Sequence, residues 1–130
     1  MKVLITISAA ALVLLSCSKF EGPGGKASII GSVQGNKYDG AGNLLSTYPM
    51  MDYDVYLIYG NESGENFYDD DVSTSYDGSF EFNYLAKGNY RLFTYGKCPS
   101  CPGGDTVLIY NIEVTGKKEV IDLGTINIRD

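Results

Sequence analysis

Residues 71–85 read DVSTSYDGSFEFNYL, and this stretch decides the fold class of the chain. Asp77-Gly78 stands between two runs in which polar and apolar residues alternate, a pattern with the period of a β-strand. We predict a β-hairpin with a type I′ turn, because Asp tolerates and Gly readily adopts the positive φ that this turn requires. The second run then places Phe80, Phe82 and Tyr84 on one face of its strand.

The same character continues on both sides of this stretch. Segments rich in Ile, Val, Tyr, Phe and Thr alternate with Gly, Asn and Asp clusters, and no window has the period of an amphipathic helix. In the last segment the apolar phase changes between Leu123 and Ile126, which predicts a β-bulge near Gly124. Besides the two strands of the hairpin, we expect strands at residues 27–34, 53–59, 90–95, 106–114 and 121–128. Seven strands in one domain predict an all-β, two-sheet sandwich.

One connection and one of the predicted strands have features of their own. Residues 35–52 are predicted to form a long loop, because the segment exceeds the usual two to five residues of a hairpin loop. The strand at residues 53–59 is apolar on both faces, with Val55 and Leu57 on one and Tyr56 and Ile58 on the other. We therefore expect a central strand that is covered on both sides.

The order of short motifs resembles a known domain family. Ile30-Gly31-Ser32-Val33, Val55-Tyr56-Leu57, Asp77 to Phe82 and Leu85 to Leu92 are similar to successive motifs of the carboxypeptidase regulatory-like domain. Those motifs are a Gly-x-Val strand, a Val-x-Leu strand, an Asp-Gly-x-Phe hairpin and a Leu-x-x-Gly-x-Tyr-x-Leu turn. The resemblance covers residues 27–95 and implies a seven-stranded Greek-key sandwich of the transthyretin (prealbumin) type without an active site. Such domains recur in surface lipoproteins of the Bacteroidetes type.

The first sixteen residues resemble a bacterial lipoprotein signal peptide. Lys2 precedes an apolar run from Val3 to Leu15, and Leu14-Leu15-Ser16-Cys17 is similar to a lipobox. The run is shorter than the roughly 20 apolar residues of a transmembrane helix. The resemblance implies cleavage before Cys17, acylation of that cysteine, export, and a lipid-anchored position at the outer membrane or cell surface. We expect a signal peptide at residues 1–16, a lipidated flexible tether at 17–26, and a sandwich domain at 27–130.

Composition argues against several functions. The net charge of −6 predicts repulsion from nucleic acid and from anionic lipid head groups, so we expect neither as a partner. The chain has no His, the commonest general base, and no Ser or Cys nucleophile has an identifiable partner. We predict a non-enzymatic protein without a cofactor, which serves as an accessory or binding module for an envelope protein or a glycan.

Cys98 and Cys101 are the sharpest chemical feature in the second half of the chain. With Cys17 acylated they are an even pair in an oxidising compartment, which predicts a disulfide that stiffens a loop. The alternatives are thiol redox exchange and a metal site shared between molecules, as in a periplasmic redox or metal-handling protein. Pro-Gly-Gly and a strand pattern follow the pair, in place of the helix that activates a redox thiol. A structural zinc site would need further Cys or His ligands.

Acidic and aromatic residues provide the remaining candidate sites. Asp69, Asp70 and Asp71 are candidate ligands for Ca²⁺, and the alternative is a charged strand edge that blocks aggregation. The chain has eleven Tyr and no Trp, and Tyr rings beside carboxylates suit contacts with sugars. The candidates in or beside the long loops are Tyr38, Tyr48, Tyr53 and Tyr68. The alternative is that these tyrosines are half-buried strand residues.

Overall fold

The computed structural model describes residues 21–60 and 67–130, so Cys17 and the expected signal peptide lie outside the described residues. Apart from the short 3₁₀ turn η1 (Pro102–Gly104), every regular element is a strand. The strands are β1 (Pro23–Tyr38), β2 (Leu44–Pro49), β3 (Asp54–Tyr59), β4 (Asp70–Ser73), β5 (Ser79–Leu85), β6 (Gly88–Lys97), β7 (Asp105–Val114) and β8 (Val120–Arg129). No helix in these ranges is long and apolar enough to cross a membrane.

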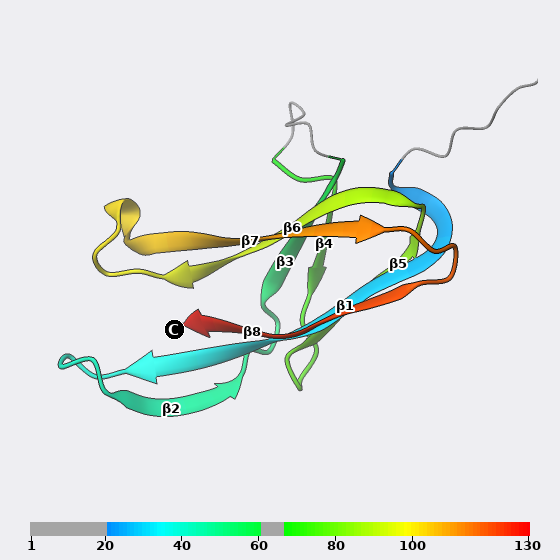
Figure 1. Ribbon diagram of the computed structural model, residues 1–130. Coiled ribbons are helices and arrows are strands. Elements are labelled where there is room, and N and C mark those ends of the chain that lie inside the picture. Colours follow the sequence, from blue (N-terminus) through cyan, green and yellow to red (C-terminus); the bar gives the residue numbers. More distant parts are fainter. Residues whose placement is uncertain (1–20, 61–66) are drawn as a thin grey trace, which may run out of the picture.

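The strands form two sheets, which lie one above the other in Figure 1. In sheet A, β1 pairs in parallel with β8 along one edge and antiparallel with β5 and then β2 along the other. Sheet B is antiparallel in the order β4-β3-β6-β7. The core lies between the sheets and includes Ile29, Val33, Val55, Leu57, Phe82, Tyr90, Leu92 and Ile126. The all-β prediction is confirmed.

Seven strands were predicted, whereas residues 21–60 and 67–130 form eight. Residues 35–52 do not form a long loop: β1 continues to Tyr38, a turn follows, and β2 returns antiparallel to β1. The Asp39 carboxylate closes the turn by accepting hydrogen bonds from the backbone N–H groups of Ala41 (2.9 Å) and Asn43 (2.8 Å). Leu44 and Leu45 are exposed, so β2 lacks the apolar alternation by which a strand is recognised.

The predicted hairpin at residues 71–85 is also wrong. β4 pairs with β3 in sheet B, whereas β5 pairs with β1 in sheet A, so the chain crosses between the sheets here. The N–H of Gly78 donates to the carbonyl of Ser75 (2.9 Å), and only Gly78 of the Asp-Gly pair has positive φ, which excludes a type I′ turn. An Asp-Gly turn is a local signal, and it does not determine which strand each arm joins.

Gly78 also marks the point where β1 changes partners. Its carbonyl accepts a hydrogen bond from the N–H of Val33 (2.8 Å), between the residues that pair with β5 and those that pair with β2. The N–H of Met50, directly after β2, donates to the carbonyl of Val33 (2.9 Å). A Cβ atom at Gly78 would lie 2.5 Å from that same carbonyl oxygen. The crossover therefore needs a glycine for space as well as for its φ of 81°.

Bulges decide the side-chain direction in two strands. In β8, the four residues from Asp122 to Thr125 lie opposite the three residues from Ile30 to Ser32 of β1, and Gly124 has a φ of 68°, which confirms the predicted bulge. In β5, the four residues from Phe82 to Leu85 lie opposite the three residues from Ala27 to Ile29 of β1. Tyr84 has a φ of 59° there and is 74% exposed. The prediction that Tyr84 shares the inward face of Phe80 and Phe82 is therefore wrong.

The folded domain begins ahead of the expected boundary at Ala27. β1 starts at Pro23, and Gly22 is buried. The hydroxyl of Tyr90 donates to the carbonyl of Ala86 (2.6 Å) and accepts from the N–H of Gly22 (2.9 Å). The N–H of Ala86 donates to the carbonyl of Gly22 (2.8 Å). These bonds attach the start of the described chain to the corner between β5 and β6.

Candidate functional site

The outer face of sheet B carries a connected group of aromatic rings. The ring of Tyr56 on β3 stacks on Phe93 of β6, with centroids 4.9 Å apart and planes 18° apart. Tyr68 lies 4.8 Å from Tyr56, and Tyr95 meets both Tyr56 and Phe93 edge-on. We call these four residues and Tyr53 the aromatic face. Tyr68 and Tyr95 are exposed, so the group presents ring surface to solvent.

Strand register explains why these rings gather. In the antiparallel pairs, Tyr56 lies opposite Asp71 of β4 on one side and Phe93 on the other, and Phe93 lies opposite Ile109 of β7. These residues form one row across four strands, and alternate residues along each strand share its face. Exposed Val107 lies opposite Tyr95 in the neighbouring row. The aromatic face therefore continues into an apolar strip on β7.

The strand predicted at residues 53–59 is central in its sheet but is not covered on both sides. Val55 and Leu57 are buried in the core, whereas Tyr56 and Ile58 are half-buried on the outer face. Among the described elements, no strand or helix packs over this face. The second apolar side of β3 was misread as a buried surface, and it is the centre of the aromatic face.

A small hollow lies at one end of the aromatic face. Asp52, Tyr53, Asp54, Tyr56 and Tyr95 line this hollow of about 230 Å³. Burial raises the pKa of Tyr53 and Tyr56, and nearby carboxylates, Asp105 for Tyr53 and Asp54 for Tyr56, raise it further. The two hydroxyls therefore stay protonated at neutral pH. The Tyr53 hydroxyl donates to the carbonyl of Tyr95 and fixes the position of its own ring.

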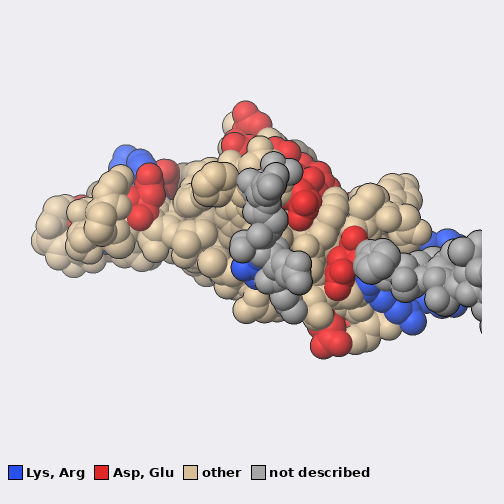
Figure 2. All heavy atoms as spheres, turned by 90° about the horizontal axis from the view of Figure 1, so that it is seen from above, with Lys and Arg blue, Asp and Glu red and all other residues tan. Residues whose placement is uncertain are grey.

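Carboxylates flank the aromatic face on the side of β4, and Figure 2 shows acidic side chains gathered in the middle of this view. Asp71 lies beside Tyr56, Asp69 accepts a hydrogen bond from the N–H of Tyr59 (2.7 Å), and Asp70 accepts one from the N–H of Asp71 (2.9 Å). Within residues 21–60 and 67–130, no three His, Cys, Asp or Glu side chains are arranged to hold a metal ion. A calcium site at Asp69, Asp70 and Asp71 stays a prediction.

The four tyrosines selected from the sequence separate into two pairs. Tyr53 and Tyr68 belong to the aromatic face. Tyr38 lies at the end of β1, with the Arg129 guanidinium 4.9 Å from its ring centroid, and the Tyr48 hydroxyl donates to the carboxylate of Asp130. Tyr38 and Tyr48 therefore contact the last two residues, Arg129 and Asp130, and hold them against β1 and β2.

Three residues of the aromatic face were missed in the sequence. Tyr56, Phe93 and Tyr95 lie within strands, whereas the candidates predicted from the sequence are tyrosines in or beside loops. The available signal was alternation: outward Tyr56 stands between buried Val55 and Leu57. An aromatic residue on the second face of a strand is as consistent with an exposed binding surface as with a second buried layer.

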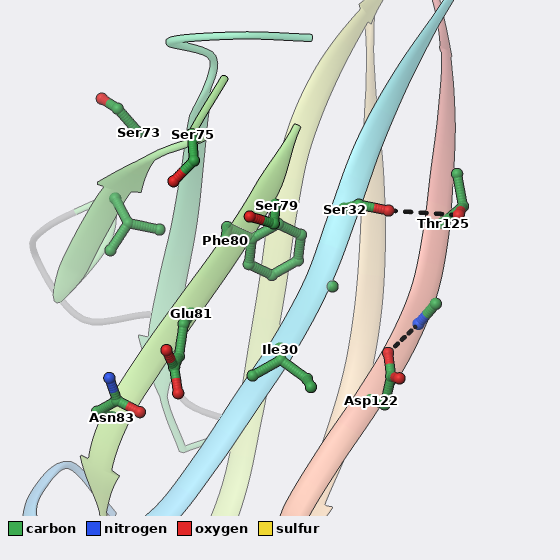
Figure 3. Close-up of a pocket in the computed structure, with 13 residues that line it drawn as sticks. Ile30, Ser32, Ser73, Ser75, Ser79, Phe80, Glu81, Asn83, Asp122 and Thr125 are labelled. Carbon is green, nitrogen blue, oxygen red and sulfur yellow. Dashed lines mark hydrogen bonds between the residues drawn. The ribbon is translucent and has the colours of Figure 1, made fainter. Parts of the chain in front are cut away.

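A second hollow, shown in Figure 3, lies on sheet A and extends to the β4–β5 connection. It has a volume of about 780 Å³, and its polar side chains include Ser32, Ser79, Glu81, Asn83, Asp122 and Thr125. Several of these already have partners: Ser32 bonds Thr125 (3.3 Å), and Asp122 accepts from the N–H of Gly124 (2.8 Å). Phe80 supplies the single ring of this lining and is 5% exposed. This second hollow, the groove on sheet A, offers hydrogen-bonding groups but little exposed aromatic surface.

Cys98 and Cys101 are joined by a disulfide in the β6–β7 loop, at the end of the molecule away from the start of β1 (Figure 1). The N–H of Cys98 donates to the carbonyl of Gly104 (2.7 Å), and the N–H of Cys101 donates to the carbonyl of Cys98 (3.0 Å). The following η1 turn has three residues, so no helix of useful length points its positive end at either sulfur.

Comparison with known proteins assigns no family. The chain matches no protein-family model, and no curated protein matches it. It is similar to the crystal structure of a candidate carbohydrate-binding protein from Pseudomonas aeruginosa, with 12% identity and a TM-score of 0.49 over 85% of this chain and 92% of that one. It is also similar to (S)-allantoin synthase, with 11% identity and a TM-score of 0.38 over 78% of this chain and 42% of that one. The resemblance to the carboxypeptidase regulatory-like domain stays a prediction.

Proposed function

We propose that this protein is a non-enzymatic, lipid-anchored binding module that holds a glycan on the aromatic face of sheet B. The observation that carries the proposal is the half-buried ring of Tyr56, which stacks on buried Phe93 and has exposed Tyr68 and Tyr95 beside it. The apolar face of a sugar ring stacks on such rings, while its hydroxyl groups bond to neighbouring polar side chains. Asp54 and Asp71 supply acceptors at the edge of the rings.

The aromatic face is a better candidate than the groove on sheet A. A glycan needs ring surface as well as hydrogen bonds, and Phe80 of the groove is buried. A glycan is also favoured over an envelope protein, because carboxylates border the rings closely. The centres of protein interfaces are typically depleted of charge.

The lipobox-like Leu14-Leu15-Ser16-Cys17 supports the proposed location at the outer membrane or cell surface, with acylated Cys17 as the anchor. We retain the carboxypeptidase regulatory-like resemblance as a proposal about ancestry, with eight strands in place of seven. The thiol redox alternative is weaker, because only a three-residue turn, and no longer helix, follows Cys101 to activate either cysteine.

Binding can be tested by affinity electrophoresis of the purified protein in gels that contain soluble polysaccharides, including a glucan, a xylan and a mannan. We expect at least one of them to retard the protein. Tyr68→Ala and Tyr95→Ala should each weaken that binding by up to about tenfold, because a stacked ring contributes about 0.5–1.5 kcal/mol.

Tyr76→Ala is the matched control, because Tyr76 is 82% exposed and lies outside the aromatic face. Thermal unfolding of each variant verifies that it is folded. The proposal would be wrong if no polysaccharide retarded the protein, or if Tyr76→Ala weakened binding as much as Tyr95→Ala. Capture of an envelope protein through Tyr68 and Tyr95, without glycan binding, would also overturn it.

A further inference from the structure

One end of this acidic molecule is locally basic. Lys26 at the start of β1, Lys87 after β5, and Lys117 and Lys118 in the β7–β8 turn surround one pocket of about 550 Å³. The sequence has ten Lys and Arg residues, and Lys2 and Lys19 lie outside the described residues, which leaves eight. Half of those eight therefore line a single pocket. Figure 2 shows blue Lys and Arg atoms gathered at the right-hand end of this view.

The pocket combines these charges with apolar surface. Its floor contains buried Leu85 and Ala86, whereas the four lysines are exposed at its rim. Tyr84, next to Leu85, is 74% exposed, and Val120, two residues after Lys118, is 60% exposed. Lysines with nearby exposed aromatic and aliphatic side chains have the composition of surfaces that contact lipid head groups.

Two carboxylates at this end reduce the positive charge without cancelling it. The Glu119 carboxylate accepts hydrogen bonds from the N–H groups of Thr115 (2.9 Å) and Gly116 (2.8 Å), and these bonds hold its pKa below the usual value. Glu21 accepts from the N–H of Asn89 (3.3 Å). The charges of these four lysines and two glutamates sum to +2, and Glu113, opposite Asn89 in the β6–β7 pair, is a further acid close to this end.

The lipid anchor of the proposed function would attach at the same end. Cys17 precedes Glu21 by four residues, and four residues span at most about 14 Å in any conformation. Glu21 contacts the β5–β6 corner, since a Cβ added to Gly88 would lie 2.2 Å from the Cγ of Glu21. A lipid on Cys17 would therefore hold the basic end close to the membrane.

We propose that the end formed by Lys26, Lys87, Lys117 and Lys118 docks on anionic phospholipid head groups. The net charge of −6 predicted repulsion from anionic lipid head groups. Contact with a membrane, however, depends on the protein charges that lie within about a Debye length of its surface. The location of the anchor rests on the proposed function, whereas the affinity of the basic end for lipid does not. Lysines near an anionic leaflet are attracted to its head groups, so the patch would orient the domain that an acylated Cys17 holds at the membrane.

The test uses the chain from residue 17 with Cys17→Ser, which contains all eight strands and carries no lipid. It is sedimented with phosphatidylcholine vesicles with and without phosphatidylglycerol, at low and high salt. We expect binding only to the anionic vesicles at low salt. Lys117→Gln/Lys118→Gln should weaken it about tenfold or more, because each lysine near such a surface contributes about 1 kcal/mol.

Lys37→Gln/Lys97→Gln is the matched control, because it changes the net charge equally at residues outside the pocket. The inference is overturned if the unlipidated chain ignores anionic vesicles, or if the control pair weakens binding as much as the pocket pair. Loss of binding on addition of glycerol phosphate would also overturn it in favour of a site for a single phosphate. Because no acyl chain is present, these outcomes are independent of whether Cys17 is lipidated and whether the aromatic face binds a glycan.

Discussion

The hydroxyl group of Tyr90 joins the first described residues to the corner between β5 and β6. It donates to the carbonyl of Ala86 and accepts from the N–H of Gly22, while its ring is 1% exposed in the core. Hydroxyl bonds of a tyrosine to backbone a few residues upstream also stabilise corners of other β-sandwiches. A single side chain therefore holds Gly22 against the backbone of Ala86.

We expect Tyr90→Phe to lower the free energy of unfolding by about 1–3 kcal/mol, because it removes a buried partner from two backbone groups. Chemical denaturation measures the change, with Tyr76→Phe as control, since Tyr76 is largely exposed. Equal stability of the two variants would show that the bonds of Tyr90 contribute nothing.

The same residue predicts a pH dependence. Burial raises the pKa of Tyr90 above its usual value of 10.0, so the folded protein keeps a proton that the unfolded chain releases. Stability should be unaffected by this group below pH 10 and should fall as the pH rises beyond it. In a pH series of denaturation curves, Tyr90→Phe should show a smaller alkaline loss than the unchanged protein.

The turn at Gly78 connects β4 of sheet B to β5 of sheet A. Its carbonyl also bonds to β1 at the point where β1 stops pairing with β5 and starts pairing with β2. We expect Gly78→Ala to destabilise the fold by about 2 kcal/mol or more, from the positive φ and the clash with Val33 combined. Gly42→Ala is the matched control, since Gly42 has a φ of 87° but no atom within 4 Å of an added Cβ. Equal losses in the two variants, compared by thermal unfolding, would exclude the clash as a cause.

The local sequence pattern predicted where strands lie better than it predicted which strands pair with one another. The bulge at Gly124 and the inward alternation of Leu108, Tyr110, Ile112 and Val114 were readable, because a strand shows its buried face in its own residues. The sheet that β4 or β5 joins depends on residues far along the chain. β2 was missed because neither of its faces is apolar and buried.

The same division applies to the candidate site. Tyr53 and Tyr68 were selectable as tyrosines beside loops, but the aromatic face exists only through the register of β3 with β6. Register follows from the whole sheet, so Phe93 and Tyr95 could not be assigned to a surface beforehand. The basic pocket was equally hidden, because its four lysines come from three separate parts of the chain.

At the scale of the whole molecule, the two ends of the sandwich differ. The basic pocket lies where β1 begins, while the turn at residues 39–43 and the disulfide loop lie at the other end (Figure 1). A strand of ten residues, such as β6, extends about 33 Å. An upright molecule would therefore hold the disulfide loop well clear of the head groups.

Depth-dependent quenching tests this orientation in the lipidated, membrane-bound protein. We expect a fluorophore on Asn89→Cys, near the basic end, to be quenched by nitroxide-labelled lipid head groups, and one on Gly40→Cys to remain bright. Both positions are exposed. Equal quenching of the two labels would indicate a molecule that lies flat on the membrane.

The parallel pairing of β1 with β8 joins the first of the described strands to the last. Ser28 pairs with Val120, a separation of 92 residues (120 minus 28), and β8 borders β1 as far as Asn36. Contacts between such distant parts of a chain are slow to form, and this one requires the C-terminal strand to have been synthesised. Sheet A therefore stays incomplete until the whole chain is available. A chain that cannot close its sheet early remains unfolded for longer, which would suit the export that we propose for this protein.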